Sequence, residues 1–179
     1  PKAGYEFAGW YENNQLLSTN LSYTFEVLSD RNLVPKYRNY SSWTVNISAN
    51  PTQIKTAGGS SAITSSAVRS VYVNGELQGT ENGSVSLSSN NPAFVVQGST
   101  VRVSENTTTS TRTATITANC GGVTNSVTLT QPGRTVTYVF TINGGTSASE
   151  TFESSGGTVK YSIVSQKTTI IDGNSTTVT

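Results

Sequence analysis

The sequence contains no histidine and no methionine, only one cysteine, and two aspartates among its 179 residues. Without histidine, the Ser-His-Asp and Cys-His catalytic arrangements and all histidine-based metal sites are excluded. The single cysteine, Cys120, has no partner for a disulfide within the chain. The composition therefore predicts a protein that is not an enzyme, with no catalytic residues, no bound metal and no cofactor.

Charge and long apolar runs are also scarce. Charged residues make up 12% of the chain, the net charge is +1, and the eleven basic residues are scattered rather than clustered. Nucleic-acid-binding domains concentrate Lys and Arg in a patch or stripe, and a membrane-spanning helix needs about 20 mostly apolar residues in a row. We therefore expect no nucleic-acid partner and no insertion into a membrane.

Hydroxyl and turn residues are abundant instead. Serine and threonine together number 55, and 16 glycines recur at short intervals. Threonine has a high β propensity and glycine punctuates turns, whereas no stretch keeps the 3.6-residue period of an amphipathic helix. The composition predicts an all-β protein and favours a β-sandwich over a helical bundle.

The clearest periodic pattern begins after position 110. Apolar and small residues alternate with hydroxyl residues through 113–118, and the alternation resumes at 123–129. Period two places every second side chain on one face of a strand, and the intervening Gly121-Gly122 pair suits a tight reversal. We expect a β-hairpin here, with Cys120 as a small residue in its turn rather than a reactive thiol.

The same region resembles a known family. The string from Glu105 to Gly133, which includes Arg112-Thr-Ala-Thr-Ile-Thr and Leu129-Thr-Gln-Pro-Gly, resembles the last strands of the BACON-type immunoglobulin-like domain. Ala57-Gly58-Gly59 looks like the opening of that family, so the resemblance covers about residues 42–133. It implies an extracellular immunoglobulin-like β-sandwich, usually a module of larger surface or glycan-handling proteins, and it does not imply catalysis.

Residues 1–38 are richer in aromatic residues than the rest of the chain. The run Gly4-Tyr-Glu-Phe-Ala-Gly-Trp10 resembles the second half of the divergent InlB B-repeat, also called the Listeria–Bacteroides repeat, which implies a small β-grasp-like unit of surface proteins. Trp10 and, further along, Tyr72 are the aromatic candidates for ligand binding, because planar rings can stack on sugars. The alternative for both residues is ordinary packing in a core.

Shorter alternating runs between these regions predict further strands. The expected segments are a linker at 38–42, strands at 43–48, 61–64, 67–73, 84–88, 94–96 and 101–103, an edge piece at 53–55, a short return strand at 76–78 and a surface loop at 79–83. The Asn74-Gly75 dipeptide between two of these segments is a strong hairpin signal. Strands of this length with frequent turns are typical of an immunoglobulin-like sandwich.

The end of the chain repeats its middle after a shift of 98 positions. Gly58-Gly59 falls on Gly156-Gly157, and Asn74-Gly75 falls on Asp172-Gly173. We expect a second sandwich of the same type, which begins near residue 135 and is truncated at the end of the sequence. Its exposed apolar face would include Phe152, Tyr161, Ile163 and Ile171.

Two acidic groupings near the end of the chain suggest chemistry but have simpler interpretations. Glu150 and Glu153 could form a carboxylate pair of the kind used in glycoside hydrolysis, but alternation places them on opposite faces of a strand. Asp172-Gly173-Asn174 is similar to part of a calcium loop but lacks the bidentate acid further on. We expect a turn at the second grouping and assign no catalytic or metal role to either.

These patterns together predict three segments. Residues 1–38 would be the C-terminal half of a Listeria–Bacteroides-type repeat, residues 39–133 a BACON-type sandwich, and residues 134–179 the start of a second one. The expected function is a non-enzymatic extracellular or cell-surface module that acts as a spacer or adhesion unit. Two alternatives stay open: a fibre or head-decoration protein in the virion of a phage of gut bacteria, and a carbohydrate-binding module of a glycan-degrading system. The expected partners are glycans, host-surface molecules or neighbouring domains of the same assembly.

Overall fold

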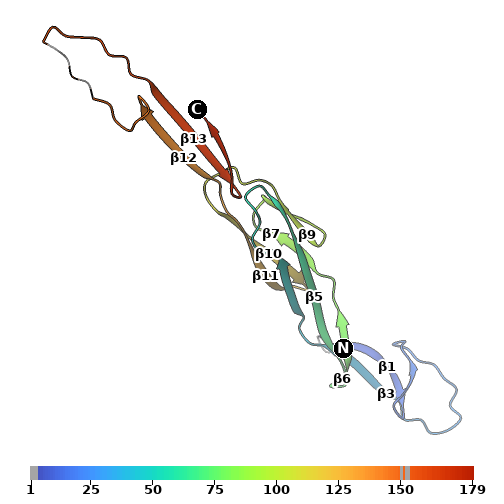
Figure 1. The fold of residues 1–179 in the computed structure, drawn as a ribbon. Helices are drawn as coiled ribbons and strands as arrows, with labels where there is room; N and C mark the ends of the chain where they lie inside the picture. The colour runs from blue at the N-terminus through green and yellow to red at the C-terminus, as the bar shows by residue number, and fades with distance from the viewer. Residues whose placement is uncertain (1–3, 150, 152–153) are drawn as a thin grey trace. The chain divides into compact units, whose positions relative to one another are not determined.

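The computed structural model describes residues 4–149, 151 and 154–179, and within them every regular element is a β-strand. Figure 1 shows the strands in chain order: β1 (Glu6–Glu12), β2 (Gln15–Ser18), β3 (Val34–Tyr40), β4 (Thr44–Asn50), β5 (Gly59–Val73), β6 (Glu76–Asn82), β7 (Ser86–Ser89), β8 (Phe94–Gln97), β9 (Thr100–Val103), β10 (Arg112–Cys120), β11 (Val123–Gln131), β12 (Thr135–Ile142), β13 (Ile163–Ile171) and β14 (Asn174–Val178). Their antiparallel sheets confirm the all-β prediction and are consistent with a β-sandwich.

The chain folds into two units, each assembled from three separate stretches. The first unit contains the residues up to Ser48, Thr64–Ser88 and Thr117–Val127, and the second contains Ala49–Ile63, Ser89–Ile116 and Thr128–Thr179. Strands β4, β5, β7, β10 and β11 contribute residues to both units. The division into segments 1–38, 39–133 and 134–179 stays a prediction.

In the first unit, β1 pairs antiparallel with both β2 and β3. Asn13 and Asn14 have positive φ angles of 50° and 65° in the turn between β1 and β2, as a tight hairpin requires. The ring of Phe7 contacts Trp10 and Tyr37 edge to face, with centroids 5.6 and 5.9 Å apart. The aromatic residues that stand out in the sequence therefore pack against one another.

Strand β3 continues further than the sequence suggests. Residues 38–40 pair with residues 71–73 of β5 in antiparallel register. The first three residues of the expected 38–42 linker are therefore strand, because pairing with β5 satisfies their backbone N–H and C=O groups.

The hairpin expected at Asn74-Gly75 is confirmed, and both of its strands are longer than expected. Asn74 and Gly75 have φ angles of 52° and 86°. β5 is one continuous strand rather than two short ones, and β6 continues to Asn82 through most of the expected loop at 79–83. The register of β5 against β6 shifts between Val71 and Tyr72, and such a bulge allows an exposed, glycine-containing strand to stay paired.

The core of the first unit brings residues of β4 and β5 together with residues of β10. Its buried members are Val45, Ala67, Ala118 and Cys120, with Trp43, Ile47, Val85, Leu87 and Val123 packed around them. Cys120 is the last residue of β10 and is only 5% exposed. The expectation that it lies in the turn is therefore wrong: Gly121 and Gly122, with φ angles of 57° and 85°, make the reversal, and Cys120 is a small core residue.

The hairpin of β10 and β11 is confirmed, and its alternation is regular. Along β10 every second residue is buried, from Ala114 through Ile116 to Cys120. In the second unit, Ile116 lies in a core with the buried side chains of Ile54, Ile63, Phe94, Val101, Val103, Ala114 and Leu129. Strand β9 pairs there with both β8 and the start of β5.

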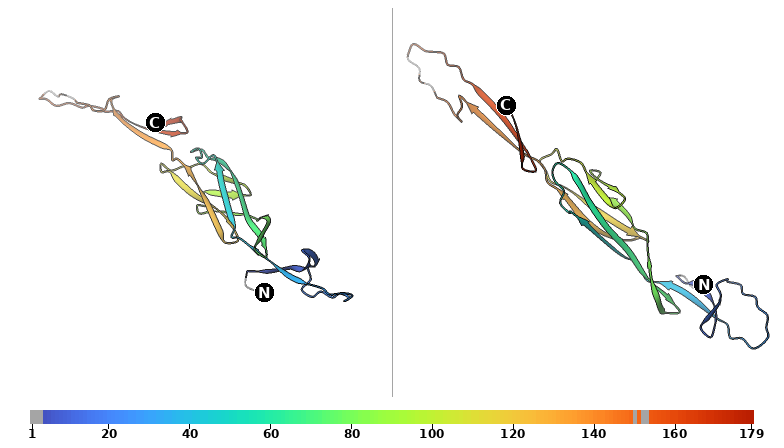
Figure 2. Two further views of the ribbon diagram at one scale, coloured as in Figure 1. Left: turned by 90° about the horizontal axis from the view of Figure 1, so that it is seen from below. Right: turned by 45° about the vertical axis from the view of Figure 1, so that its right-hand side comes forward.

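Strands β12, β13 and β14 form a separate three-stranded antiparallel sheet within the second unit (Figures 1 and 2). The turn between β13 and β14 is the one expected at Asp172-Gly173, whose φ angles are 47° and 85°. None of the residues in these three strands, all of which the structure describes, is buried. The sheet is therefore formed by backbone pairing without a core of its own.

Candidate functional site

A buried polar network holds the loop that precedes β5 in the second unit. The Gln131 side chain is 0% exposed, and its amide donates to the carbonyl oxygens of Lys55, Thr56 and Ser104 at 2.8, 3.2 and 2.9 Å. Its Oε1 accepts a hydrogen bond from Arg112 Nε at 2.6 Å. Because burying an amide is costly unless its polar atoms are bonded, Gln131 specifies how these segments meet.

Asn106 supports the same loop. It is also 0% exposed, and its backbone N–H donates to the Thr56 carbonyl at 2.8 Å. Its side-chain amide donates to the carbonyls of Ser110 and Pro132 at 2.8 and 3.1 Å. The Thr56 carbonyl thus accepts hydrogen bonds from two buried residues, the side-chain amide of Gln131 and the backbone N–H of Asn106, and these bonds fix the loop backbone.

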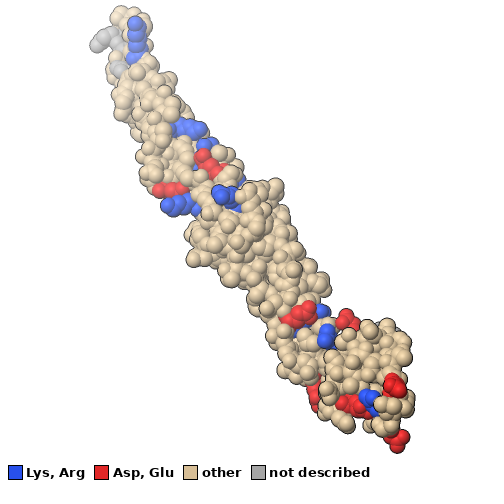
Figure 3. Space-filling view, turned by 90° about the vertical axis from the view of Figure 1, so that its right-hand side faces the viewer, with Lys and Arg blue, Asp and Glu red and all other residues tan. Residues whose placement is uncertain are grey.

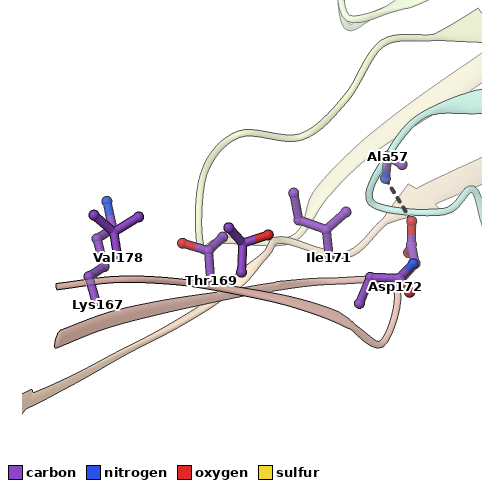
Figure 4. A pocket seen from close by; sticks show the side chains of 8 residues that line it. Ala57, Lys167, Thr169, Ile171, Asp172 and Val178 are labelled. Carbon is purple, nitrogen blue, oxygen red and sulfur yellow. Dashed lines mark hydrogen bonds between the residues drawn. The ribbon is translucent and has the colours of Figure 1, made fainter.

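On the outer side of this loop lies the turn of the β13–β14 hairpin. Both carboxylate oxygens of Asp172 accept hydrogen bonds: one from the backbone N–H of Thr56 and the other from that of Ala57, each at 2.8 Å. Figure 4 shows the bond from Ala57. The amides of Ala57 and Thr56, together with the Thr56 hydroxyl and the charge of Lys55, hold the pKa of the Asp172 carboxyl below its usual range against an opposing desolvation effect. Hydrogen bonds to the charged form have this effect because they disfavour protonation.

A shallow hollow of about 350 Å³ adjoins this contact. Apart from Ala57, its lining comes from the β13–β14 hairpin: Lys167, Thr169, Ile171, Asp172, Asn174, Thr176 and Val178. The strand register explains this selection, because Lys167 is paired with Val178 and Ile171 with Asn174, so that these side chains share one face. Figure 4 shows them on the same side of the hairpin. The hollow offers hydroxyl, amide, aliphatic and ammonium groups, which suit binding.

The same face continues onto β12. Tyr138 is paired with Lys167 and Phe140 with Ser165, so both aromatic side chains stand on the face that carries the hollow. Tyr138 is 58% exposed and Phe140 is 64% exposed, and Ile163 on the same face is 74% exposed. We call this surface, which comprises Val136, Tyr138, Phe140, Ile142, Ile163, Ile171 and Val178, the apolar face of the sheet.

The two aromatic candidates from the sequence lie in the first unit and away from one another along its sheet. Trp10 on β1 is half-buried, contacts Phe7, and donates its indole N–H to the Leu21 carbonyl at 3.3 Å. Tyr72 on β5 is half-buried and is paired with Asn39 and Leu77. Neither lines the hollow, and their role in ligand binding stays a prediction.

Sequence reasoning did not single out Phe140 or Lys167, although a signal was present. Val136, Tyr138, Phe140 and Ile142 alternate with period two, the pattern of one apolar strand face. The docking of Asp172 on a loop 116 positions earlier had no local signal. Glu150, Glu153 and Phe152 lie outside the described residues.

Charged side chains elsewhere form structural pairs. Arg31 lies 2.7 Å from Glu12, and Arg69 lies 3.0 Å from Glu81 while its guanidinium also covers the ring of Tyr40 at 3.7 Å. On the face in Figure 3, charged side chains gather in small groups separated by uncharged surface. In the described part of the chain, His, Cys, Asp and Glu nowhere form a group of three that could hold a metal. No helix suited to crossing a bilayer occurs among those residues.

Comparison with known proteins gives one match. Residues 80–132, from the end of β6 to β11 and the residue after it, match the model of the BACON family, whose description is "Putative binding domain, N-terminal". No curated protein and no solved structure matches the chain. The resemblance to the BACON family is confirmed over that stretch, whereas the Listeria–Bacteroides repeat at 1–38 and the second sandwich from about 135 stay predictions. Residues 80–132 are thus similar to a family of domains described as binding modules.

Proposed function

We propose that the chain is a non-enzymatic extracellular module of a multi-domain surface protein, in which serial sandwiches act as a spacer or adhesion unit. The observation that carries this proposal is the recurrence of one hairpin. Val73 is paired with Glu76 around Asn74-Gly75, and 98 positions later Ile171 is paired with Asn174 around Asp172-Gly173. The match of residues 80–132 to a family described as binding supports the binding half of the proposal.

The recurrence extends to the geometry of the turn. Asn74 and Asp172 have φ angles of 52° and 47°, and the following glycines have 86° and 85°. Both turn residues also accept a backbone hydrogen bond through the side chain, since Asn74 Oδ1 receives the N–H of Tyr37 at 3.0 Å. Agreement of the turn geometry and of the two residue pairs nearest the turn favours a repeated unit over a chance likeness of two hairpins.

The surface chemistry suits an extracellular spacer. The face of the β12–β13–β14 sheet opposite the apolar face carries mostly hydroxyl and amide groups, such as Thr137, Gln166 and Thr177. Hydroxyl-rich strands with few charges do not favour nonspecific electrostatic association. Length in such proteins comes from repetition, because each repeated unit adds its own dimension to the array.

Carbohydrate binding is a second candidate, and one observation favours it. Tyr138 and Phe140 are exposed on a sheet face beside Thr169, Asn174 and Lys167. Exposed planar rings flanked by hydrogen-bonding groups are the composition that sugar recognition uses.

A binding assay with the full chain separates the two candidates. A pure spacer predicts no signal on a glycan array and no binding to cells, whereas saturable binding to intact host cells would identify the adhesion unit. Sugar binding that is lost in Tyr138→Ala and Phe140→Ala, but kept in the control Tyr72→Ala, would replace the first candidate by the second. Turnover of a glycan substrate by the full chain would contradict both.

A further inference from the structure

The contact between Asp172 and the loop before β5 has the features of a built receptor for a carboxylate. Two consecutive backbone N–H groups, those of Thr56 and Ala57, each donate at 2.8 Å to a different oxygen of one carboxylate. Charge-assisted hydrogen bonds of this length are stronger than neutral ones. A pair of adjacent amides matches the two acceptor oxygens of a carboxylate, whereas a carboxamide offers only one acceptor oxygen.

The receptor side is held in place independently of Asp172. The carbonyls of Lys55 and Thr56 are bonded from behind by the buried Gln131 amide at 2.8 and 3.2 Å. Gly58 N–H donates to the Lys55 carbonyl at 3.0 Å and closes the turn of the loop. The carbonyls of Lys55 and Thr56 point inward, so the N–H groups of the same two peptide units, which belong to Thr56 and Ala57, face the hairpin. The loop is already held in this arrangement, and little conformational freedom is therefore lost when a carboxylate binds.

Three of the four charged residues on the surrounding elements are cations, and this balance favours a bound anion. Charged residues on the packed elements are Lys55 on the loop, Glu105 and Arg112 behind it, and Lys167 on the hairpin. Arg112 is engaged with Gln131 and with the carbonyl of Ser104 at 2.6 Å. Lys55 favours the charged form of Asp172.

The other hairpin provides a second, independent instance of docking by the same turn position. Asn74 accepts the Tyr37 N–H through Oδ1 and donates its own N–H to the Tyr37 carbonyl, both at 3.0 Å. The side chain of Asn74 thus accepts one backbone N–H through one oxygen, whereas the side chain of Asp172 accepts two backbone N–H groups through two oxygens. The first residue of the turn is a docking residue in both hairpins.

We propose that the amides of Thr56 and Ala57 form a carboxylate-binding site whose ligand is the acidic turn residue of the β13–β14 hairpin. The site acts as a latch that ties this hairpin to the loop before β5. This assignment is independent of what the module binds, because it concerns a contact within the second unit. Lowering the pH through the depressed pKa of Asp172 protonates one acceptor and releases the latch, while the latch is fully formed above the usual carboxyl pKa of about 3.9.

Amide hydrogen exchange in the full chain tests the site directly. Asp172→Gly removes the carboxylate but tolerates the positive φ of the turn, so the hairpin can still form. We expect exchange at Thr56 and Ala57 to become about tenfold faster or more, with amides on β10 unchanged. Asp172→Asn keeps one acceptor and should leave only one of the two amides protected.

The matched control is Asn74→Gly at the equivalent turn. It should accelerate exchange at Tyr37 and leave Thr56 and Ala57 as they are. In the unmodified chain, the chemical shifts of the Thr56 and Ala57 amides should titrate together with the Asp172 carboxyl, below its usual pKa. Unchanged exchange in Asp172→Gly, equal protection of both amides in Asp172→Asn, or amide shifts that do not follow the Asp172 titration would overturn the assignment.

Discussion

The β5–β6 and β13–β14 hairpins share a turn geometry and the two residue pairs nearest the turn, yet they differ in what covers them. On β5, Ile63 is 5% exposed and Ala67 is 2% exposed. The positions 98 residues later are Tyr161, which is 46% exposed, and Ser165, which is also exposed. Local sequence is therefore sufficient to specify a hairpin, whereas burial depends on strands brought from elsewhere in the chain.

The covering strands of β5 can be named. Ala67 packs with Ala118 and Cys120 of β10 and with Val45 of β4. Apolar surface removed from water stabilises by about 25 cal/mol per Å², and this contribution is smaller for the apolar face of the β12–β13–β14 sheet, on which no residue is buried. Three strands need a covered hydrophobic face for independent stability, so that sheet should be the weaker part of the molecule.

The largest effect should follow from opening the covered core. Ile116→Ala removes most of a fully buried aliphatic side chain, and we expect a loss of about 2–5 kcal/mol in the free energy of unfolding. Urea titration followed by circular dichroism measures it. The neighbouring Thr115→Ser, on the other face of β10, should change stability by less than about 0.5 kcal/mol. Equal losses in the two variants would contradict the facing of β10.

The next effect concerns the buried polar network. Gln131→Leu keeps the side-chain size but removes the donor to Lys55, Thr56 and Ser104. Each of these carbonyls keeps a second donor, but the substitution removes three hydrogen bonds and leaves Arg112 Nε without its acceptor. This loss should cost about 1–3 kcal/mol, measured by the same titration. The control Gln97→Leu alters an exposed glutamine and should be nearly neutral. A neutral Gln131→Leu would show that water replaces the amide in this network.

The smallest effect on stability should come from the uncovered sheet. Phe140→Ser exchanges a side chain that is 64% exposed, so the free energy of unfolding should change by less than about 0.5 kcal/mol. Self-association at high concentration, measured by analytical ultracentrifugation, should decrease, because exposed apolar patches promote association. A loss comparable with that of Ile116→Ala would mean that Phe140 is covered in solution.

Much of the fold could be predicted from short-range signals. Period-two alternation located β10. The dipeptides Gly121-Gly122 and Asn74-Gly75, whose residue types tolerate positive φ, located the reversals. These signals suffice because strand facing and tight turns depend on neighbours only a few residues apart.

The rest depends on contacts between distant segments. Gly79, Glu81 and Asn82 are residue types typical of a loop, but they pair with β5 and extend β6. Residues 38–40 look like a linker until β5 provides their partner. The docking of Asp172 joins residues 116 positions apart. No pattern within a single stretch carries that information.

Native-state hydrogen exchange on the full chain tests the central comparison most directly. Each amide of β13 has a counterpart 98 positions earlier on β5, in a hairpin with the same turn geometry and the same two residue pairs next to the turn. If cover rather than local sequence determines stability, the amides of β13 should exchange about 100-fold faster or more than their β5 counterparts, through local opening of the uncovered sheet. Equal protection of the two strands would contradict the account.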